Sequence, residues 1–176
     1  MSLMDHYALP IHGLKEGKHE YEFEADAQFF EYFENADITG GDLKITLILD
    51  KKSQFMQLDF HINGYIRTIC DRCLDDFDYP VNIHEQLFVR FGEDAGEISD
   101  NVIVIPREES RLNVAQFIYE YSALALPVGK THPDTAKGQP GCNPEMIEKL
   151  NEHIRHPEEG TDPRWDALKN LNKKNE

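Results

Sequence analysis

Two cysteines separated by two residues, Cys70 and Cys73, are the sharpest chemical feature of this 176-residue sequence. A Cys-x-x-Cys pair in a tight turn can place both sulfurs on one metal ion, and a tetrahedral zinc site then needs two further ligands. His132 and Cys142 are the natural candidates, because both lie in one irregular segment that is otherwise hard to explain. The nine residues between them do not form a paired ligand spacing.

Two other interpretations of the cysteine pair stay open. A thioredoxin-type redox pair opens a helix after a parallel strand, whereas Cys70 and Cys73 lie between patterns typical of antiparallel strands. The simplest interpretation is a reduced turn without metal, because three cysteines do not form a disulfide framework. We therefore expect no cofactor, with zinc as the alternative, and His153 or His156 could replace a ligand.

Acidic residues follow the cysteine pair and dominate the composition. The chain has 18 Lys and Arg against 33 Asp and Glu, a formal net charge of −15. This balance disfavours broad electrostatic binding to nucleic acid. It favours basic partners, among which ribosomal proteins are an abundant class. Asp75 and Asp76 are expected on a solvated acidic face that meets such a partner, since their order does not match a calcium loop.

The C-terminal segment carries a second candidate contact surface. Asp162 followed by Pro163 is typical of a capped helix with proline at its first position. Trp165 is the only tryptophan, and tryptophan and arginine are enriched in binding hot spots. We predict that Asp162, Arg164 and Trp165 bind a partner. Docking of Trp165 on its own sheet is the alternative.

The elements of the first half that must position these side chains are predicted to be strands, because apolar and polar residues alternate there. These strands are residues 21–25, 43–49, 55–62, 65–69, 79–91 and 102–105. Asn63-Gly64 predicts a hairpin turn, and residues 92–100 are expected to form a loop. The short connections favour an antiparallel meander that could curl towards a barrel.

One main helix is predicted over about 113–124, with Asn113 as its cap and apolar residues at helical spacing. The apolar residues are Val114, Phe117, Ile118, Tyr121 and Leu124, all expected to pack on the sheet. The sequence thus predicts an α+β fold, an antiparallel sheet with one main helix and a C-terminal helical tail. We expect a β-rich core over 1–127, an irregular Cys/His-bearing loop with a short helix over 128–160, and the helical tail over 161–176.

Signatures of catalysis and of membrane insertion are scarce. The chain has no serine nucleophile elbow, glycine-rich phosphate loop or paired helical histidines with glutamate, so we expect no catalytic residues and no enzyme. The N-terminus lacks the pattern of a signal peptide, and apolar runs are far shorter than the roughly 20 residues that span a bilayer. A cytoplasmic protein without a membrane partner is predicted.

Three segments in a fixed order resemble the YceD family. The first is Cys-Asp-Arg-Cys-Leu at residues 70–74. The second is the leucine-proline segment at residues 123–128, which is followed by His132 and Cys142. The third is Asp-Pro-Arg-Trp at residues 162–165, which is followed by leucines. The resemblance implies a role in accumulation of 23S ribosomal RNA, and hence in large-subunit assembly, without known catalysis. Many relatives carry further cysteines in the loop where this chain has only Cys142.

The sequence and the resemblance together predict a non-catalytic factor in large ribosomal subunit biogenesis. Its expected partner is a basic ribosomal protein or a large-subunit precursor, with direct RNA contact left open. One alternative is a metal-dependent RNA-processing enzyme that uses the cysteine pair and nearby acids. The other is a zinc or redox sensor that uses Cys70 and Cys73.

Overall fold

The computed structural model describes residues 3–33, 37–93, 96–134 and 141–153. The chain forms two compact units, Met1–Cys142 and Asn143–Glu176. The described part of the second unit holds helix α3 (Pro144–His153), in the region where a short helix was expected. The predicted C-terminal helix lies outside the described residues, and the three-part division of the chain stays a prediction.

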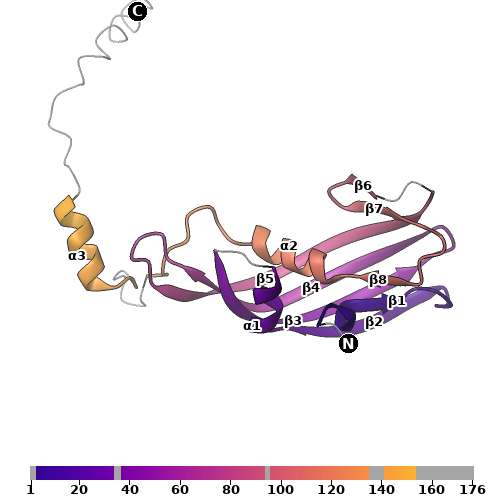
Figure 1. Cartoon of the computed structure of the whole chain (residues 1–176), viewed down its shortest axis with the longest axis horizontal. Helices are drawn as coiled ribbons and strands as arrows, with labels where there is room; N and C mark the ends of the chain where they lie inside the picture. Colours follow the sequence, from indigo (N-terminus) through magenta and orange to yellow (C-terminus); the bar gives the residue numbers. More distant parts are fainter. Residues whose placement is uncertain (1–2, 34–36, 94–95, 135–140, 154–176) are drawn as a thin grey trace, which may run out of the picture. The chain divides into compact units, whose positions relative to one another are not determined.

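The first unit is built on a six-stranded sheet in the order β2-β3-β4-β5-β7-β6 (Figure 1). Its strands are β2 (Gly17–Ala25), β3 (Ile38–Lys51), β4 (Phe55–Ile69), β5 (Asp76–Phe91), β6 (Gly96–Ser99) and β7 (Val102–Ile105). Neighbours are antiparallel except for β5 and β7, which run parallel. The predicted α+β class is confirmed, and the sheet stays open rather than closing into a barrel.

One face of this sheet carries the hydrophobic core, because the buried residues of each long strand alternate with exposed or half-buried ones. Leu47 of β3 lies opposite Phe60 of β4, and both are fully buried. Helices α1 (Ala27–Tyr32) and α2 (Ala115–Leu124) pack on this face through Phe29, Phe30 and Ile118 (Figure 1). The sheet therefore needs both helices to exclude water from its apolar side.

The hairpin predicted at Asn63-Gly64 is wrong, since β4 runs through both residues without a turn. Gly64 pairs with Leu43 on one side and with Val81 on the other. Its φ is +147°, and a Cβ atom there would collide with the carbonyl oxygen of Asp42. The glycine is needed for the close approach of a neighbouring strand rather than for a turn.

Other predictions have mixed outcomes. The main helix is confirmed, but its cap residue is Val114, and Asn113, the predicted cap, is the last residue of β8. The Asn113 side chain still accepts a hydrogen bond from the Ala115 N–H at 2.9 Å. Leu124 is 81% exposed, so its assignment to the core is wrong. The loop expected over 92–100 is also wrong in part, because it contains β6. The structure also contains two elements that were not predicted. They are the small sheet of β1 (Ala8–Pro10) and β8 (Arg111–Asn113) and the 3-10 helix η1 (Leu3–Tyr7).

We predict that Gly64→Ala lowers the free energy of unfolding by about 2 kcal/mol or more, because β3 leaves no space for a Cβ and the φ is unfavourable. Gly129→Ala is the matched control, since nothing lies within 4 Å of a Cβ built there. Its effect should stay within about 0.5 kcal/mol. Urea denaturation measures both, and equal stability of the two variants would contradict the assignment.

Candidate metal centre

The turn between β4 and β5 holds the first two candidate ligands. The Cys70 N–H donates to the Asp75 carbonyl at 2.9 Å, and the Leu74 N–H donates to the Cys70 carbonyl at 2.9 Å. Leu74 has a φ of 62°, a left-handed conformation that non-glycine residues adopt only where the surroundings hold them. The Cys70 and Cys73 side chains are both buried, which fixes them on the inner side of this tight turn.

The loop after α2 is fastened to the same turn through Asp71 and Lys130. The Asp71 N–H donates to the Lys130 carbonyl at 2.7 Å, and the Lys130 N–H donates to Asp71 Oδ2 at 2.6 Å. Lys130 Nζ also lies 3.8 Å from Asp71 Oδ1. Because His132 follows two residues later, these contacts bring its ring to the cysteine turn.

Two further residues position His132 and Cys142. The His132 ring lies against Phe77 of β5, with 4.7 Å between ring centroids. A Cβ atom at Gly141 would collide with the carbonyl oxygen of Pro133, so only glycine lets the returning chain pass this close. The buried Cys142 side chain then lies beside that of Cys70.

The four ligand atoms form one compact cluster, all within 4.8 Å of one another. The Cys70 and Cys142 sulfurs are 3.8 Å apart, and the Cys73 sulfur is 3.4 Å from His132 Nδ1. A tetrahedral zinc ion with ordinary bond lengths would hold two sulfurs about 3.8 Å apart and a sulfur and a nitrogen about 3.5 Å apart. A disulfide needs about 2.05 Å. The cysteines are free thiols at distances that suit a shared metal ion.

The surroundings within the cluster shift the pKa values of two of its thiols. Burial opposes ionisation of Cys70, but hydrogen bonds from the backbone of Cys73, Arg72 and His132 outweigh burial and lower its pKa to about 6. Burial and the neighbouring Cys70 and Cys73 sulfurs raise the pKa of Cys142. A cation among the sulfurs would offset both burial and mutual repulsion, so the electrostatics and the geometry point to the same kind of ligand.

Comparison with known proteins assigns the chain to a family. A family model described as large ribosomal RNA subunit accumulation protein YceD matches residues 58–172, more than half of the chain. The chain belongs to the YceD family. The YceD match begins within β4 and contains all four clustered residues. Membership associates the chain with accumulation of large-subunit ribosomal RNA.

The other comparisons add no relative to the YceD match. A search of curated proteins found no match. A search of solved structures found none either. In the described part of the chain, no helix is both long and apolar enough to cross a membrane.

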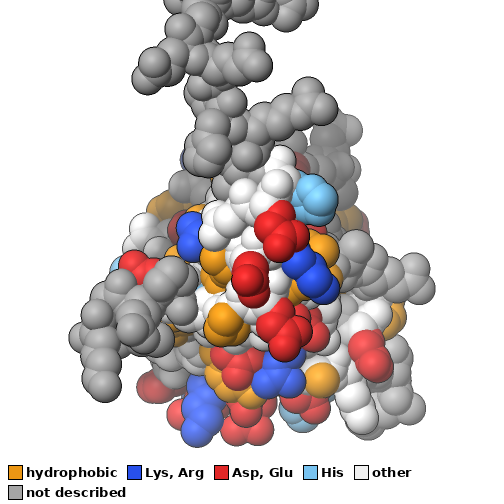
Figure 2. All heavy atoms as spheres, turned by 90° about the vertical axis from the view of Figure 1, so that its left-hand side faces the viewer, with side chains coloured by type: hydrophobic (Ala, Val, Ile, Leu, Met, Phe, Trp, Pro, Cys, Tyr) orange, Lys and Arg blue, Asp and Glu red, His pale blue; other side chains and the backbone are white. Residues whose placement is uncertain are grey.

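Only some of the predicted partner-binding residues lie in the described part of the chain. Asp75, at the end of the cysteine turn, and Asp76, the first residue of β5, are both exposed. Asp76 Oδ1 accepts a hydrogen bond from Thr39 Oγ1 at 3.2 Å. On the face drawn in Figure 2, acidic side chains lie among basic and apolar ones. The remaining predicted contact residues lie outside the described residues: Asp162, Arg164 and Trp165.

Sequence reasoning proposed all four clustered side chains but missed the residues that bring them together. The contact of Asp71 with Lys130 joins segments 59 residues apart, and neither residue type signals it. Gly141 beside Cys142 was an available signal, because a glycine next to a ligand often allows close backbone approach.

We predict that Asp71→Ala lowers the free energy of unfolding by about 1–2 kcal/mol, because the Lys130 N–H loses its acceptor. Asp71→Asn keeps an acceptor oxygen and removes only a partly exposed ion pair, so it should cost less than about 0.5 kcal/mol. Asp134→Ala, an exposed carboxylate in the same loop, is the control. Chemical denaturation separates the three, and an Asn variant as unstable as the Ala variant would contradict a role for the hydrogen bond.

Proposed function

We propose that this chain is a cytoplasmic, non-catalytic factor in large ribosomal subunit biogenesis that binds a basic ribosomal protein or a precursor particle. The YceD family match is the observation that supports a role in large ribosomal subunit biogenesis. The net charge of −15 supports a basic partner over direct binding to RNA phosphates. Asp75 at the end of the cysteine turn, Asp76 at the start of β5, and Asp162, Arg164 and Trp165 near the C-terminus are the proposed contact residues.

We further propose that Cys70, Cys73, His132 and Cys142 bind one zinc ion. The observation that supports zinc is the cluster of three thiols and one imidazole, a ligand set typical of structural zinc sites. Four protein ligands fill a tetrahedral sphere, whereas a catalytic zinc keeps an open position for water or substrate. The cluster therefore favours a structural ion over the alternative of a metal-dependent RNA-processing enzyme.

The proposed ion has a definite structural task. It would join the turn between β4 and β5 to the loop that follows α2, at the place where Asp71 and Lys130 already meet. Because Asp75 ends that turn and Asp76 begins β5, the ion would also fix the two acidic side chains that we propose as partner contacts. The redox-sensor alternative would instead need two sulfurs to close to about 2.05 Å.

We expect about one zinc ion per chain in protein purified without chelator, because the four ligands complete one tetrahedral site. Cys73→Ser and Cys142→Ser should lose most of it. His12→Ala changes an exposed histidine outside the cluster and should keep it. Mass spectrometry of the metal content provides the measurement. Wild-type protein with less than about 0.2 zinc per chain would end the zinc proposal without touching the family assignment.

We also expect the tagged protein to sediment with large-subunit precursors in gradients of cell extract, and a moderate salt wash to release it, because salt screens exposed charges. Asp75→Lys with Asp76→Lys should shift it to the top of the gradient. The control, Glu20→Lys with Glu22→Lys, makes the same charge change on β2 and should still sediment. Wild-type protein found only at the top would contradict direct binding to the precursor.

A further inference from the structure

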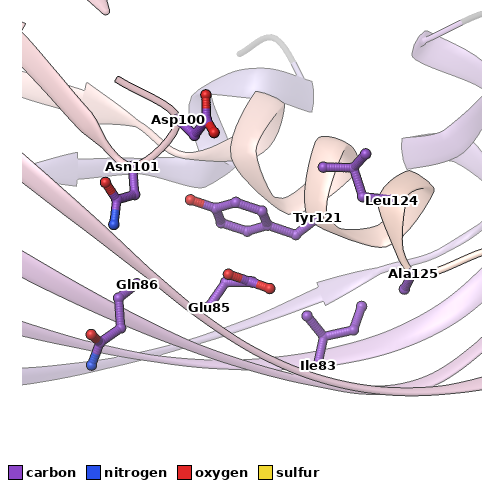
Figure 3. A pocket seen from close by; sticks show the side chains of 8 residues that line it. All are labelled: Ile83, Glu85, Gln86, Asp100, Asn101, Tyr121, Leu124 and Ala125. Atoms are coloured by element: carbon purple, nitrogen blue, oxygen red, sulfur yellow. The ribbon is translucent and has the colours of Figure 1, made fainter. Parts of the chain in front are cut away.

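A second candidate binding site lies away from the cysteine cluster. A pocket of about 450 Å³ opens between α2, the edge of β5 and the turn from β6 to β7 (Figure 3). Strand β7 pairs with β5 only from Phe88 onward, so no described strand covers the preceding edge of β5 on this side. The volume lies in the range of pockets that bind small ligands or single side chains.

Tyr121 of α2 forms the centre of the pocket. Its ring packs edge-on against the buried Phe60, with 5.3 Å between centroids, so its position is fixed from behind. The hydroxyl oxygen is buried and has no hydrogen-bond partner among the described residues. Burial, followed by the charges of Glu85, Glu120 and Glu97, raises the pKa of Tyr121 to about 12, so the phenol is neutral.

The rim of the pocket carries two acidic side chains, which form no ion pair with a described residue. The carboxylates of Glu85 and Asp100 lie on opposite sides of the Tyr121 ring (Figure 3). Neither forms an ion pair with a described residue, and no lysine or arginine lines the pocket. Two unneutralised carboxylates beside an aromatic face favour a cation and repel a phosphate.

The same pocket has an apolar side. Leu124 is 81% exposed although it belongs to the apolar stripe of α2, and Ile83 lies on the sheet below it. An exposed leucine beside two carboxylates suits a side chain with an apolar stem and a charged end. Lysine and arginine both have such stems, but only the planar guanidinium stacks on a tyrosine ring while it pairs with carboxylates.

We propose that this pocket binds an arginine side chain from an extended basic segment of a protein partner. The guanidinium stacks on the Tyr121 ring beside the carboxylates of the rim, and its stem covers Leu124. The inference rests on the proposed function for the identity of the partner as a basic ribosomal protein, while the pocket can be tested alone.

The test uses the full chain and a fluorescently labelled peptide of alternating arginine and glycine, followed by fluorescence anisotropy at low salt. The same peptide with citrulline, a neutral analogue of arginine, should bind at least about tenfold more weakly. Glu85→Gln with Asp100→Asn should weaken arginine-peptide binding about tenfold. Glu20→Gln with Glu22→Gln removes the same charge on β2 and should change it less than about twofold. Equal losses in the two double variants would overturn the proposal, because binding would then depend on net charge alone.

Two variants separate the Tyr121 ring from its buried hydroxyl. Tyr121→Phe keeps the ring and loses no hydrogen bond, so its free energy of unfolding should not fall and arginine-peptide binding should change less than about twofold. Tyr121→Leu removes the stacking surface and should weaken arginine-peptide binding about threefold. Unchanged peptide binding by Tyr121→Leu would overturn the role of the ring. Pocket variants that bind the peptide like wild type while the wild-type protein sediments with precursors would reject the pocket and keep the proposed function. Pocket variants that lose peptide binding, together with wild-type protein found only at the top of the gradient, would keep the pocket and reject binding to the precursor.

Discussion

Strand β4 is the element on which both candidate sites depend. It is paired with β3 on one side and with β5 on the other along nearly all of its 15 residues. Slipping either pairing by one residue would turn the apolar side chains to water, so a single register is enforced. Cys70 follows directly after the strand, and Phe60 within it fixes Tyr121. The same register therefore positions the metal ligands at one end and the acidic pocket beside the middle.

The relative magnitudes of the forces at the cysteine turn explain why an ion suits it. The loop after α2 offers few buried apolar side chains, and its contact with Asp71 is partly exposed, a kind of ion pair that contributes at most about 1 kcal/mol. A structural zinc ion contributes on the order of 10 kcal/mol where it is bound. The polar contact of Asp71 with Lys130 can align the ligands, while only a metal would hold the loop firmly.

The sequence predicted what local pattern controls and failed where distant segments decide. The strand at 102–105 and the main helix were readable from apolar spacing, and the four clustered side chains from ligand chemistry alone. Asn63-Gly64 was misassigned because a two-residue turn signal carries no information about neighbours on both sides of a strand. The pairing of Leu9 with Leu112 joins segments about a hundred residues apart and leaves no local trace.

Charge and pocket would act at different ranges on a basic partner. A net charge of −15 attracts any basic protein and speeds encounter, but salt screens it beyond about 10 Å and it cannot distinguish arginine from lysine. Selection of arginine over lysine needs a rigid stacking surface at close range. The Tyr121 ring provides one because Phe60 packs behind it. Its unpartnered, buried hydroxyl destabilises the free protein by about 1–3 kcal/mol. A partner meets the ring and not this buried oxygen, so the ring face and the two rim carboxylates are the groups that would select arginine.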